Sequence, residues 1–284
     1  MPPSPLDDLD PNTEVFVSPV HLAGAGSRDV VFNILDSAPG WSKTVAFETD
    51  TYYTSPCQRV RIANPLESYY GGWTITFSED PLGVPDWIST FDRGTPNEAV
   101  AAFARVLVHS LPGNFRDYFS DGKHYGPGPE QLIRDGEWEF VRGSRPHLNV
   151  APDGHMALRT RDGWVHEYNE LLVPAKSLWR LSAGPDPVHA PTWRAFFSGK
   201  THPHLRAAAI AALISSTPVP RFAADIPEHH HRLVDVHRTA PTATVRAQAA
   251  LTRTPHVPKP TSAINAPTLT TNPRPAHGRS RRQR

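Results

Sequence analysis

The sequence predicts an α+β protein with two tandem helix–antiparallel-meander–helix domains of the same fold, plus a disordered, basic, proline-rich C-terminal tail. The main observation is an internal repeat. Residues 73–112 match residues 179–218 at 12 of 40 positions without a gap, at a constant shift of 106. A repeat of about 100 residues is too long for a solenoid unit and indicates a duplicated domain. The other two observations are helix and strand patterns within each copy, and a change of composition after residue 218.

The positions that match between the copies carry residue types that anchor a core. They include Trp73/Trp179, Pro85/Pro191, Trp87/Trp193, Phe91/Phe197, Thr95/Thr201, Leu107/Leu213 and Pro112/Pro218. Core anchors are what duplication preserves most simply, so we interpret the four tryptophans as core residues rather than as an aromatic binding surface. The repeat therefore predicts an architecture but names no reaction.

The first copy is assigned to residues 14–113. Apolar residues recur at helical spacing after Ser27, and a Pro-Gly pair ends that helix. Trp73–Phe77 alternates apolar and polar residues, as a half-buried strand does. Thr95–Glu98 has the form of a helix start, with an N-cap threonine and a capping-box glutamate. The other strands expected in this copy are Thr44–Phe47, Thr51–Thr54 and Arg59–Ile62, with a turn at Ser55–Gln58.

The second copy is assigned to residues 114–218 and contains an insertion. The stretch from the turn proline to the shared tryptophan runs from Pro56 to Trp73 in the first copy. The corresponding stretch in the second copy, from Pro152 to Trp179, is longer. The extra residues include Arg161–Tyr168, which we expect to form one more strand pair. Packing common to both copies cannot account for Trp164 and Tyr168 in this insertion. These two side chains are the candidates for contact with a partner.

Composition sets limits on location. Residues 1–13 are proline-rich and acidic, are expected to be disordered, and lack the features of a secretory signal. No stretch approaches the ~20 apolar residues that span a bilayer, so no membrane partner is expected. The single cysteine, Cys57, excludes an intramolecular disulfide and fits a reducing compartment. We expect a soluble, cytoplasmic protein.

The charge is divided unevenly along the chain. Residues 221–284 carry 11 Lys/Arg and 3 Asp/Glu, whereas residues 1–220 carry 18 and 25, giving net charges of +8 and −7. The tail at 219–284, mostly disordered by its composition, could contact phosphates or could only solubilise the chain. The phosphate-contact candidates are Arg274, Arg279, Arg281, Arg282 and Arg284.

Three further motifs are weak as sites. Gly24-Ala25-Gly26 lacks the third glycine of a dinucleotide fingerprint and is interpreted as a turn. Cys57 has no histidine near it in sequence, so we interpret it as a surface thiol. His229–His231 with Asp235 and His237 could share helical faces, but an incidental histidine run is favoured. No catalytic residue, metal site or cofactor is predicted.

The twofold pattern of a Ser-Pro or Pro-Asp turn, a strand tryptophan, a Pro-x-Trp and a closing alanine-rich helix resembles a known family. This is the SPDY-motif domain of unknown function, common in streptomycetes and often encoded on their plasmids and mobile elements. The first copy carries Leu22–Gly24, Ser55-Pro56, Trp73, Pro85–Trp87 and Thr95-Pro96; the second carries Pro152–Gly154, Trp179, Pro191–Trp193 and Thr201.

The resemblance covers about residues 15–218 and departs at Cys57-Gln58, where Asp-Gly or Asp-Tyr is expected. It implies an actinobacterial protein, and because the family has no established activity it supplies no site residue. The leading hypothesis is a non-enzymatic protein that binds an unidentified protein partner. The alternative is a nucleic-acid-associated accessory protein of a plasmid or mobile element, binding through the tail. An enzyme of unrecognised type is a third hypothesis.

Overall fold

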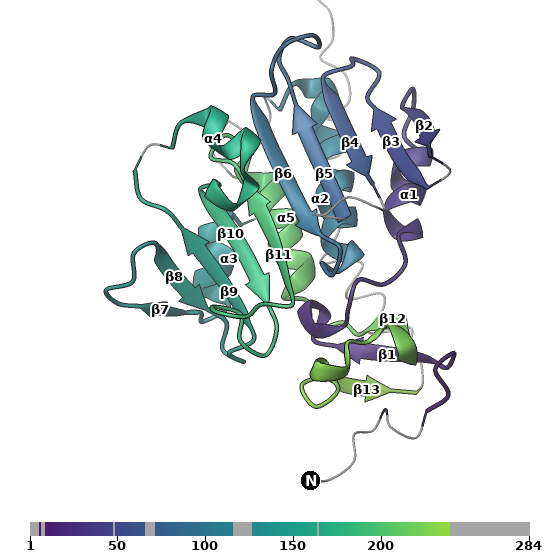
Figure 1. Ribbon diagram of the computed structural model, residues 1–284, viewed down its shortest axis with the longest axis vertical. Coiled ribbons are helices and arrows are strands. Elements are labelled where there is room, and N and C mark those ends of the chain that lie inside the picture. The colour runs from purple at the N-terminus through teal and green to yellow at the C-terminus, as the bar shows by residue number, and fades with distance from the viewer. Residues whose placement is uncertain are drawn as a thin grey trace, which may run out of the picture.

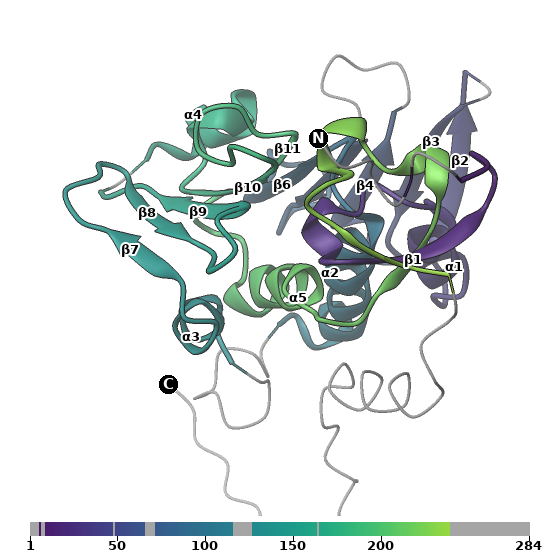
Figure 2. The ribbon, with the colours of Figure 1, turned by 90° about the horizontal axis from the view of Figure 1, so that it is seen from below.

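The computed structural model describes residues 6, 9–47, 49–65, 72–115, 127–163 and 165–238. Its described part contains a ten-stranded antiparallel sheet and a separate three-stranded sheet (Figure 1). The helices α1, α2, α3 and α5 cover one face of the larger sheet, and the short helix α4 lies on the other side (Figure 2). The predicted α+β class is confirmed.

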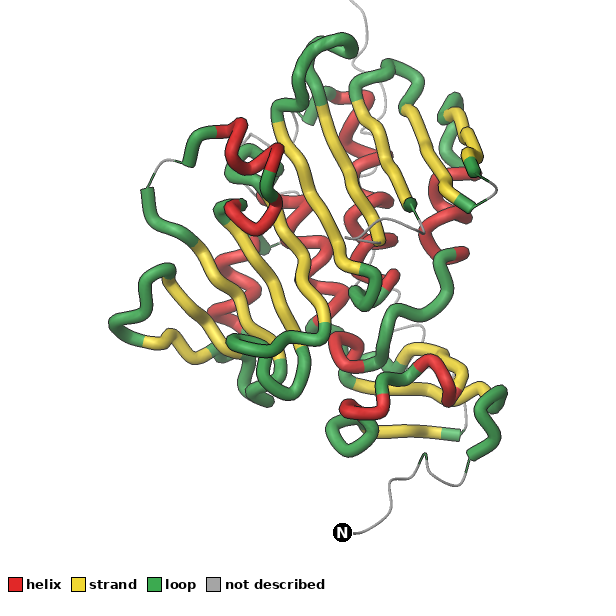
Figure 3. Tube along the Cα trace, in the orientation of Figure 1, coloured by secondary structure: helices red, strands yellow, loops and turns green. Residues whose placement is uncertain are grey.

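Both copies run from a helix through strands to a closing helix (Figure 3). The bounds in the first copy are α1 (Asp29–Asp36), β2 (Ser42–Ala46), β3 (Asp50–Thr54), β4 (Val60–Asn64), β5 (Gly72–Phe77), β6 (Trp87–Asp92) and α2 (Asn97–Ser110). Those in the second are α3 (Pro129–Asp135), β7 (Glu139–Val141), β8 (His147–Val150), β9 (Met156–Thr160), α4 (Glu167–Leu172), β10 (Trp179–Ala183), β11 (Trp193–Phe197) and α5 (Pro203–Leu213).

The two copies join edge to edge in a single sheet. The strand order is β2-β3-β4-β5-β6-β11-β10-β9-β8-β7, so β6 and β11 form the seam. At the seam Phe91 pairs with Ala195, and the repeat-equivalent pair is Ser89 with Phe197. A pseudo-twofold axis therefore passes through the central pair, Thr90 and Phe196.

Side chains reinforce the seam in the same twofold manner. The Arg194 N–H donates to Asp92 Oδ2 (3.0 Å), and the Ile88 N–H donates to Ser198 Oγ (3.0 Å). The Thr95 hydroxyl donates to the Arg194 carbonyl, and Thr201 donates to the Ile88 carbonyl, both at 3.3 Å. The predicted N-cap role of Thr95 is therefore wrong. Its hydroxyl bonds across the seam, and α2 begins at Asn97 without a side-chain cap.

One hydrophobic core spans both copies. Phe91 and Phe197, repeat equivalents, have ring centroids 5.5 Å apart, and Phe103 lies 5.6 Å and 6.2 Å from them. All three rings are buried in the core cluster that also holds the four repeated tryptophans. The core role predicted for these tryptophans is confirmed, and the tandem copies share their core rather than each enclosing its own.

The insertion does not form the expected strand pair. It contains α4 and a 3₁₀ turn at Pro174–Lys176. The strands on either side, β9 and β10, pair directly with each other and are also paired to β8 and β11 on their outer sides. Because neither strand has a free edge, an inserted segment has nothing to pair with in the sheet, and it folds as a helix instead.

The three-stranded sheet unites segments from near both ends of the described chain. Its strands are β1 (Glu14–Ser18), β12 (Val219–Phe222) and β13 (Asp235–His237), with β1 in the centre. Val15 and Val17 are fully buried against apolar residues of the later segment. Residues 219–238 therefore belong to the fold, although they are part of the segment 219–284 for which the composition predicts mostly disorder.

Part of the N-terminal segment is ordered as well. Leu6 is buried in the small core, and the carbonyls of Pro11 and Thr13 accept hydrogen bonds from Ala224 and Ala223. The expectation of disorder over residues 1–13 is therefore wrong for these positions. Composition missed this order because the segment is stabilised by residues that follow β12, close to the other end of the described chain.

A buried ion pair fixes the small sheet to the first copy. Arg221 on β12 donates from Nη1 and Nη2 to the two carboxylate oxygens of Glu98 on α2, at 2.8 Å and 2.7 Å. Its Nε and Nη2 also donate to the carbonyls of Ala23 and Gly24. Gly26 has a φ of +68° and passes so close to Arg221 that a Cβ would lie 2.5 Å from its guanidinium carbon.

Candidate functional site

The helix α4 presents one of the two predicted partner-contact residues. Tyr168 lies on α4 and its side chain is 52% exposed. Leu172, one helical turn later, is 78% exposed, and the adjacent Val173 is 39% exposed. Trp164 and the five tail arginines lie outside the described residues. Within the part that is described, the insertion thus displays a small apolar surface, Tyr168–Leu172–Val173.

A buried carboxylate holds α4 in place. Glu170 is only 5% exposed, and its oxygens accept hydrogen bonds from the N–H groups of Leu178 (2.7 Å) and Gly199 (3.0 and 3.1 Å). Leu178 directly precedes β10, and Gly199 follows β11. At the start of the helix, the His166 ring accepts a hydrogen bond from the Tyr168 N–H. The exposed apolar side chains are therefore carried on a fixed helix.

The sheet face opposite α1, α2, α3 and α5, called the uncovered face here because only α4 and loops lie on it, carries arginines on three adjacent strands of the second copy. In β9, β10 and β11 the side chains of Leu158, Leu181 and Ala195 are buried on the helix-covered face. Alternation along a strand places the intervening residues on the opposite face. These are Arg159, Arg180 and Arg194, and Arg161 continues the same alternation just beyond β9.

The arginines are close to one another and are poorly neutralised. Arg159 and Arg180 are direct cross-strand partners. Burial lowers the pKa of Arg180 to about 10, with further lowering by the charges of Arg159, Arg194 and Arg161. Its Nε is buried and has no hydrogen-bond partner among the described residues. We call Arg159, Arg161, Arg180 and Arg194 the arginine cluster.

The neighbours of the arginine cluster are mainly backbone carbonyls. Arg159 donates to the Val188 carbonyl (3.0 Å) and Arg161 to the Ala175 carbonyl (3.1 Å), so the cluster reaches the insertion. Asp92 lies beside Arg194, and the N–H and the charge of Arg194 both lower the pKa of Asp92. Burial outweighs them and raises the pKa of Asp92 to about 6. Among the described residues, no carboxylate forms an ion pair with any arginine of the cluster.

The first copy lacks this cluster. The cross-strand pair Ala63 and Thr74 occupies the place of Arg159 and Arg180. Ile88 occupies the place of Arg194 at the shift of 106. The matched positions of the repeat do not include these arginines. Arg180 and Arg194 stand at mismatched positions of the segment 179–218, whereas Arg159 and Arg161 precede that segment.

The predicted histidine run lies at the junction between the segment that links β12 to β13 and the second copy, rather than in a solvated helix. The side chains of His229 and His230 both place Nε2 at hydrogen-bond distance from Thr192 Oγ1, at 2.8 Å and 2.9 Å. His230 Nδ1 lies 2.8 Å from the Leu22 carbonyl. Because a carbonyl only accepts, Nδ1 carries the proton and Nε2 accepts from the threonine hydroxyl. Burial lowers the pKa of His230 to about 4, and nearby histidines add to the shift.

The helical faces considered for His231 with Asp235 and for His230 with His237 do not form. Glu228–His230 is a 3₁₀ turn, and Asp235 and His237 lie on β13. A second contact at this junction joins His21 Nε2 to Asp153 Oδ2 at 2.8 Å. No group of three His, Cys, Asp or Glu side chains within the described ranges is arranged to hold a metal ion.

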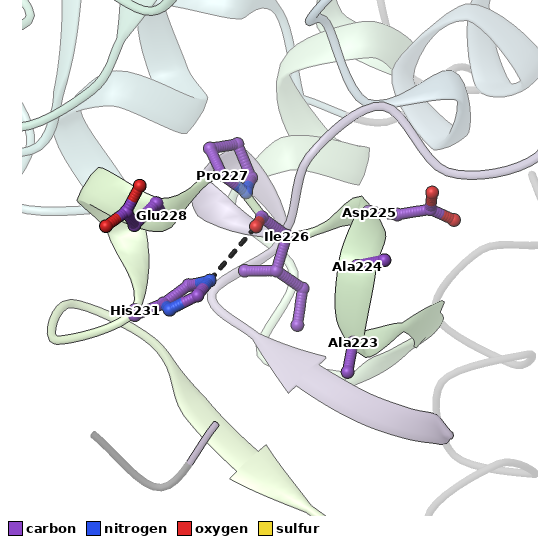
Figure 4. A pocket seen from close by; sticks show the side chains of 7 residues that line it. All are labelled: Ala223, Ala224, Asp225, Ile226, Pro227, Glu228 and His231. Atoms are coloured by element: carbon purple, nitrogen blue, oxygen red, sulfur yellow. Dashed lines mark hydrogen bonds between the residues drawn. The ribbon is translucent and has the colours of Figure 1, made fainter. Parts of the chain in front are cut away.

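A hollow of about 420 Å³ lies beside this junction (Figure 4). A single stretch of chain forms it, and the His231 ring faces the Ile226 carbonyl at 3.1 Å. The lining residues are Ala223, Ala224, Asp225, Ile226, Pro227, Glu228 and His231. The Asp225 side chain is drawn well apart from His231, so the lining offers no convergent set of catalytic groups.

Part of the first copy is similar to a known protein family. Residues 54–112 match the model of SPDY, described as a domain of unknown function (DUF317). The chain contains an SPDY domain. No curated protein matches the chain, and no solved structure does. Among the described residues, no helix is both long and apolar enough to cross a membrane.

The residues that carry the SPDY resemblance are structural. Trp73 and Trp87 are buried, and Trp73 Nε1 donates to Asn97 Oδ1 at 2.8 Å. Ser55–Gln58 forms the predicted turn, with a hydrogen bond from the Gln58 N–H to the Ser55 carbonyl and an exposed Cys57. The arginine cluster and α4 both lie outside the segment that matches the SPDY model.

Proposed function

We propose that this SPDY-domain protein is a non-enzymatic accessory protein that binds a protein partner through α4 and the uncovered sheet face of its second copy. The observation that carries the proposal is the apolar surface Tyr168–Leu172–Val173 on a helix that has no counterpart among the described residues of the first copy. Exposed apolar side chains that share one rigid element are typical of partner interfaces. A cytoplasmic location and an actinobacterial source belong to the same proposal.

Rigidity of the presenting helix supports this function. Two chain segments donate to Glu170, so α4 does not have to become ordered when a partner binds. Preorganised side chains lose less conformational entropy on binding, and aromatic anchors such as Tyr168 contribute large contact areas. A helix inserted only for packing would bury its apolar residues, whereas α4 buries its glutamate.

The test compares two double variants of the full chain as baits in lysate of the organism that encodes it. Tyr168→Ser with Leu172→Ser removes the apolar surface, and Leu82→Ser with Val84→Ser is the matched control. Leu82 is 92% and Val84 is 57% exposed, in the first copy. We expect at least one stoichiometric protein to be retained by wild type and control and reduced at least tenfold with the first variant. Identical sets of retained proteins would contradict the proposal.

A second proposal concerns the tail and rests on the charge asymmetry of +8 against −7. We propose that the tail gives the protein a non-specific affinity for nucleic acid, as for an accessory protein of a plasmid or mobile element. Each arginine–phosphate contact adds a salt-sensitive increment. Deletion of residues 252–284 should abolish a gel shift that weakens with added salt, and an unchanged shift would end this proposal.

A further inference from the structure

The arginine cluster is arranged as a compact array of guanidinium groups. Arg159 and Arg180 face each other across β9 and β10, and Arg194 lies on the next strand. Neighbouring strands are about 4.8 Å apart, and alternate residues of one strand are about 7 Å apart. Four positive groups therefore lie within a few side-chain widths on one face of the sheet.

The fold does not require this array. The equivalent pair in the first copy is Ala63 and Thr74, and the sheet geometry there is the same. Like charges directly opposite each other on a sheet are destabilising. The Nε of Arg180, which is buried and has no hydrogen-bond partner in the described part of the chain, adds a desolvation cost. A bound anionic group would relieve both costs.

We propose that the arginine cluster binds a carboxylate-rich segment of the protein partner, a step that rests on the partner-binding function proposed above. The cluster is continuous with the insertion, because Arg161 donates to the Ala175 carbonyl beside α4. A partner seated on Tyr168, Leu172 and Val173 would therefore extend over the guanidinium groups. Arginine forms bidentate hydrogen bonds with carboxylates, which gives such a contact direction as well as charge.

Two observations favour a protein carboxylate over the phosphates of a nucleic acid. Residues 1–220 carry a net charge of −7, which repels a long polyanion at distances beyond the cluster itself. The surface that α4 presents next to the cluster is apolar and consists of one tyrosine and two aliphatic side chains. Apolar and aromatic residues bordered by arginine match the composition of protein–protein interfaces.

The probe is a dye-labelled peptide of twelve residues that alternates glutamate and leucine, measured by fluorescence anisotropy with the full chain. In every protein the five tail arginines between positions 274 and 284 are replaced by glutamine, so that these side chains do not bind the probe. Arg159→Ala with Arg180→Thr installs the residues of the first copy. The control, Arg61→Ala with Arg142→Ala, removes the same charge from exposed positions.

We expect the cluster variant to bind the peptide at least tenfold more weakly than the parent, and the control less than twofold more weakly. Binding by the parent should also weaken between 50 and 300 mM salt, as expected for screened charges. No binding by the parent, or equal losses in both variants, would overturn the proposal. Tighter binding of a twelve-nucleotide single-stranded DNA than of the peptide would overturn the assignment to carboxylates.

The inference and the proposed function fail separately. Tyr168→Ser with Leu172→Ser leaves all four guanidinium groups intact, so this variant should still bind the glutamate peptide. If the native partner depends on Tyr168 and Leu172 but not on Arg159 and Arg180, the function stands and the inference falls. If the peptide depends on the arginines and no partner depends on α4, the inference stands without that function.

Discussion

On the uncovered face of the sheet, the first copy carries Ala63 and Thr74 where the second carries Arg159 and Arg180. On the covered face, both copies bury the same aromatic anchors, including Phe91 and Phe197. The covered face determines whether the chain folds, because it forms the shared core. The uncovered face can diverge without loss of the fold, so we place the proposed binding surface where the two copies differ.

The largest effect is expected in the core that the two copies share. Phe91→Ala and Phe197→Ala remove equivalent rings beside the seam, and each should lower the free energy of unfolding by about 3–5 kcal/mol. Because one core spans both copies, urea denaturation followed by circular dichroism should show a single transition for each variant. Two resolved transitions would mean that the copies unfold independently.

The small sheet can be separated from the first copy at its ion pair. Arg221→Ala leaves Glu98 without its partner, and we expect a loss of about 3 kcal/mol in the free energy of unfolding. Lys43→Ala is the matched control because its ion pair with Asp36 is exposed, and it should cost less than about 1 kcal/mol. Equal losses in urea denaturation would show that burial of the Arg221 pair has no effect.

The contact of the small sheet with the second copy should be sensitive to pH. His230 has a pKa of about 4 in the folded protein and an ordinary value of 6.5. The unfolded chain therefore binds a proton that the folded protein does not, and stability falls as pH decreases from 6.5 towards 4. Moving from pH 7.5 to 5.5 should cost about 1 kcal/mol through this residue.

Substituting the residue isolates that contribution. His230→Gln should lose about 1 kcal/mol less on acidification than wild type does, in urea denaturation at the two pH values. Asp92 acts in the opposite direction in both proteins, because its raised pKa of about 6 favours the folded state at lower pH. An identical loss in wild type and variant would exclude His230 as the source.

The smallest effect concerns the uncovered face itself. Arg180→Thr introduces the first-copy residue and removes a half-buried charge from three neighbouring charges. We expect an increase of a few tenths of a kcal/mol in the free energy of unfolding, greater at low salt than at high salt because salt screens the repulsion. The reverse change in the first copy, Thr74→Arg, should lower the free energy of unfolding by less than this amount, because its cross-strand neighbour Ala63 is uncharged. A stability loss in Arg180→Thr would indicate a structural role for the charge.

The repeat and the alternation of Trp73–Phe77 predict most of the large sheet correctly, because these patterns report local burial. The sequence does not reveal the seam, since hydrogen bonds such as that between Thr95 and Arg194 join residues far apart in sequence. The order of residues 219–238 is missed for a similar reason. Only two side chains of β12 are buried, which is too short a pattern to recognise without β1 beside it.

Only part of the candidate site can be predicted from the sequence. The sequence predicts Tyr168 because the insertion is visible as a difference in spacing between the copies. Arg159, Arg180 and Arg194 are scattered in sequence, and only the pairing of β9, β10 and β11 brings them together. Long-range pairing places side chains on a common face, and a local pattern contains no record of it.

The central position of β1 in the small sheet has a consequence for synthesis of the chain. Val15 pairs with Arg221, so β1 leaves the ribosome long before its first partner strand is made. At about 5–20 residues per second, the ~200 residues between the two strands take ~10–40 s to synthesise. During that time both edges of a valine-containing strand remain unpaired while the first copy can already begin to fold, so the start of the chain is among the last parts to be completed.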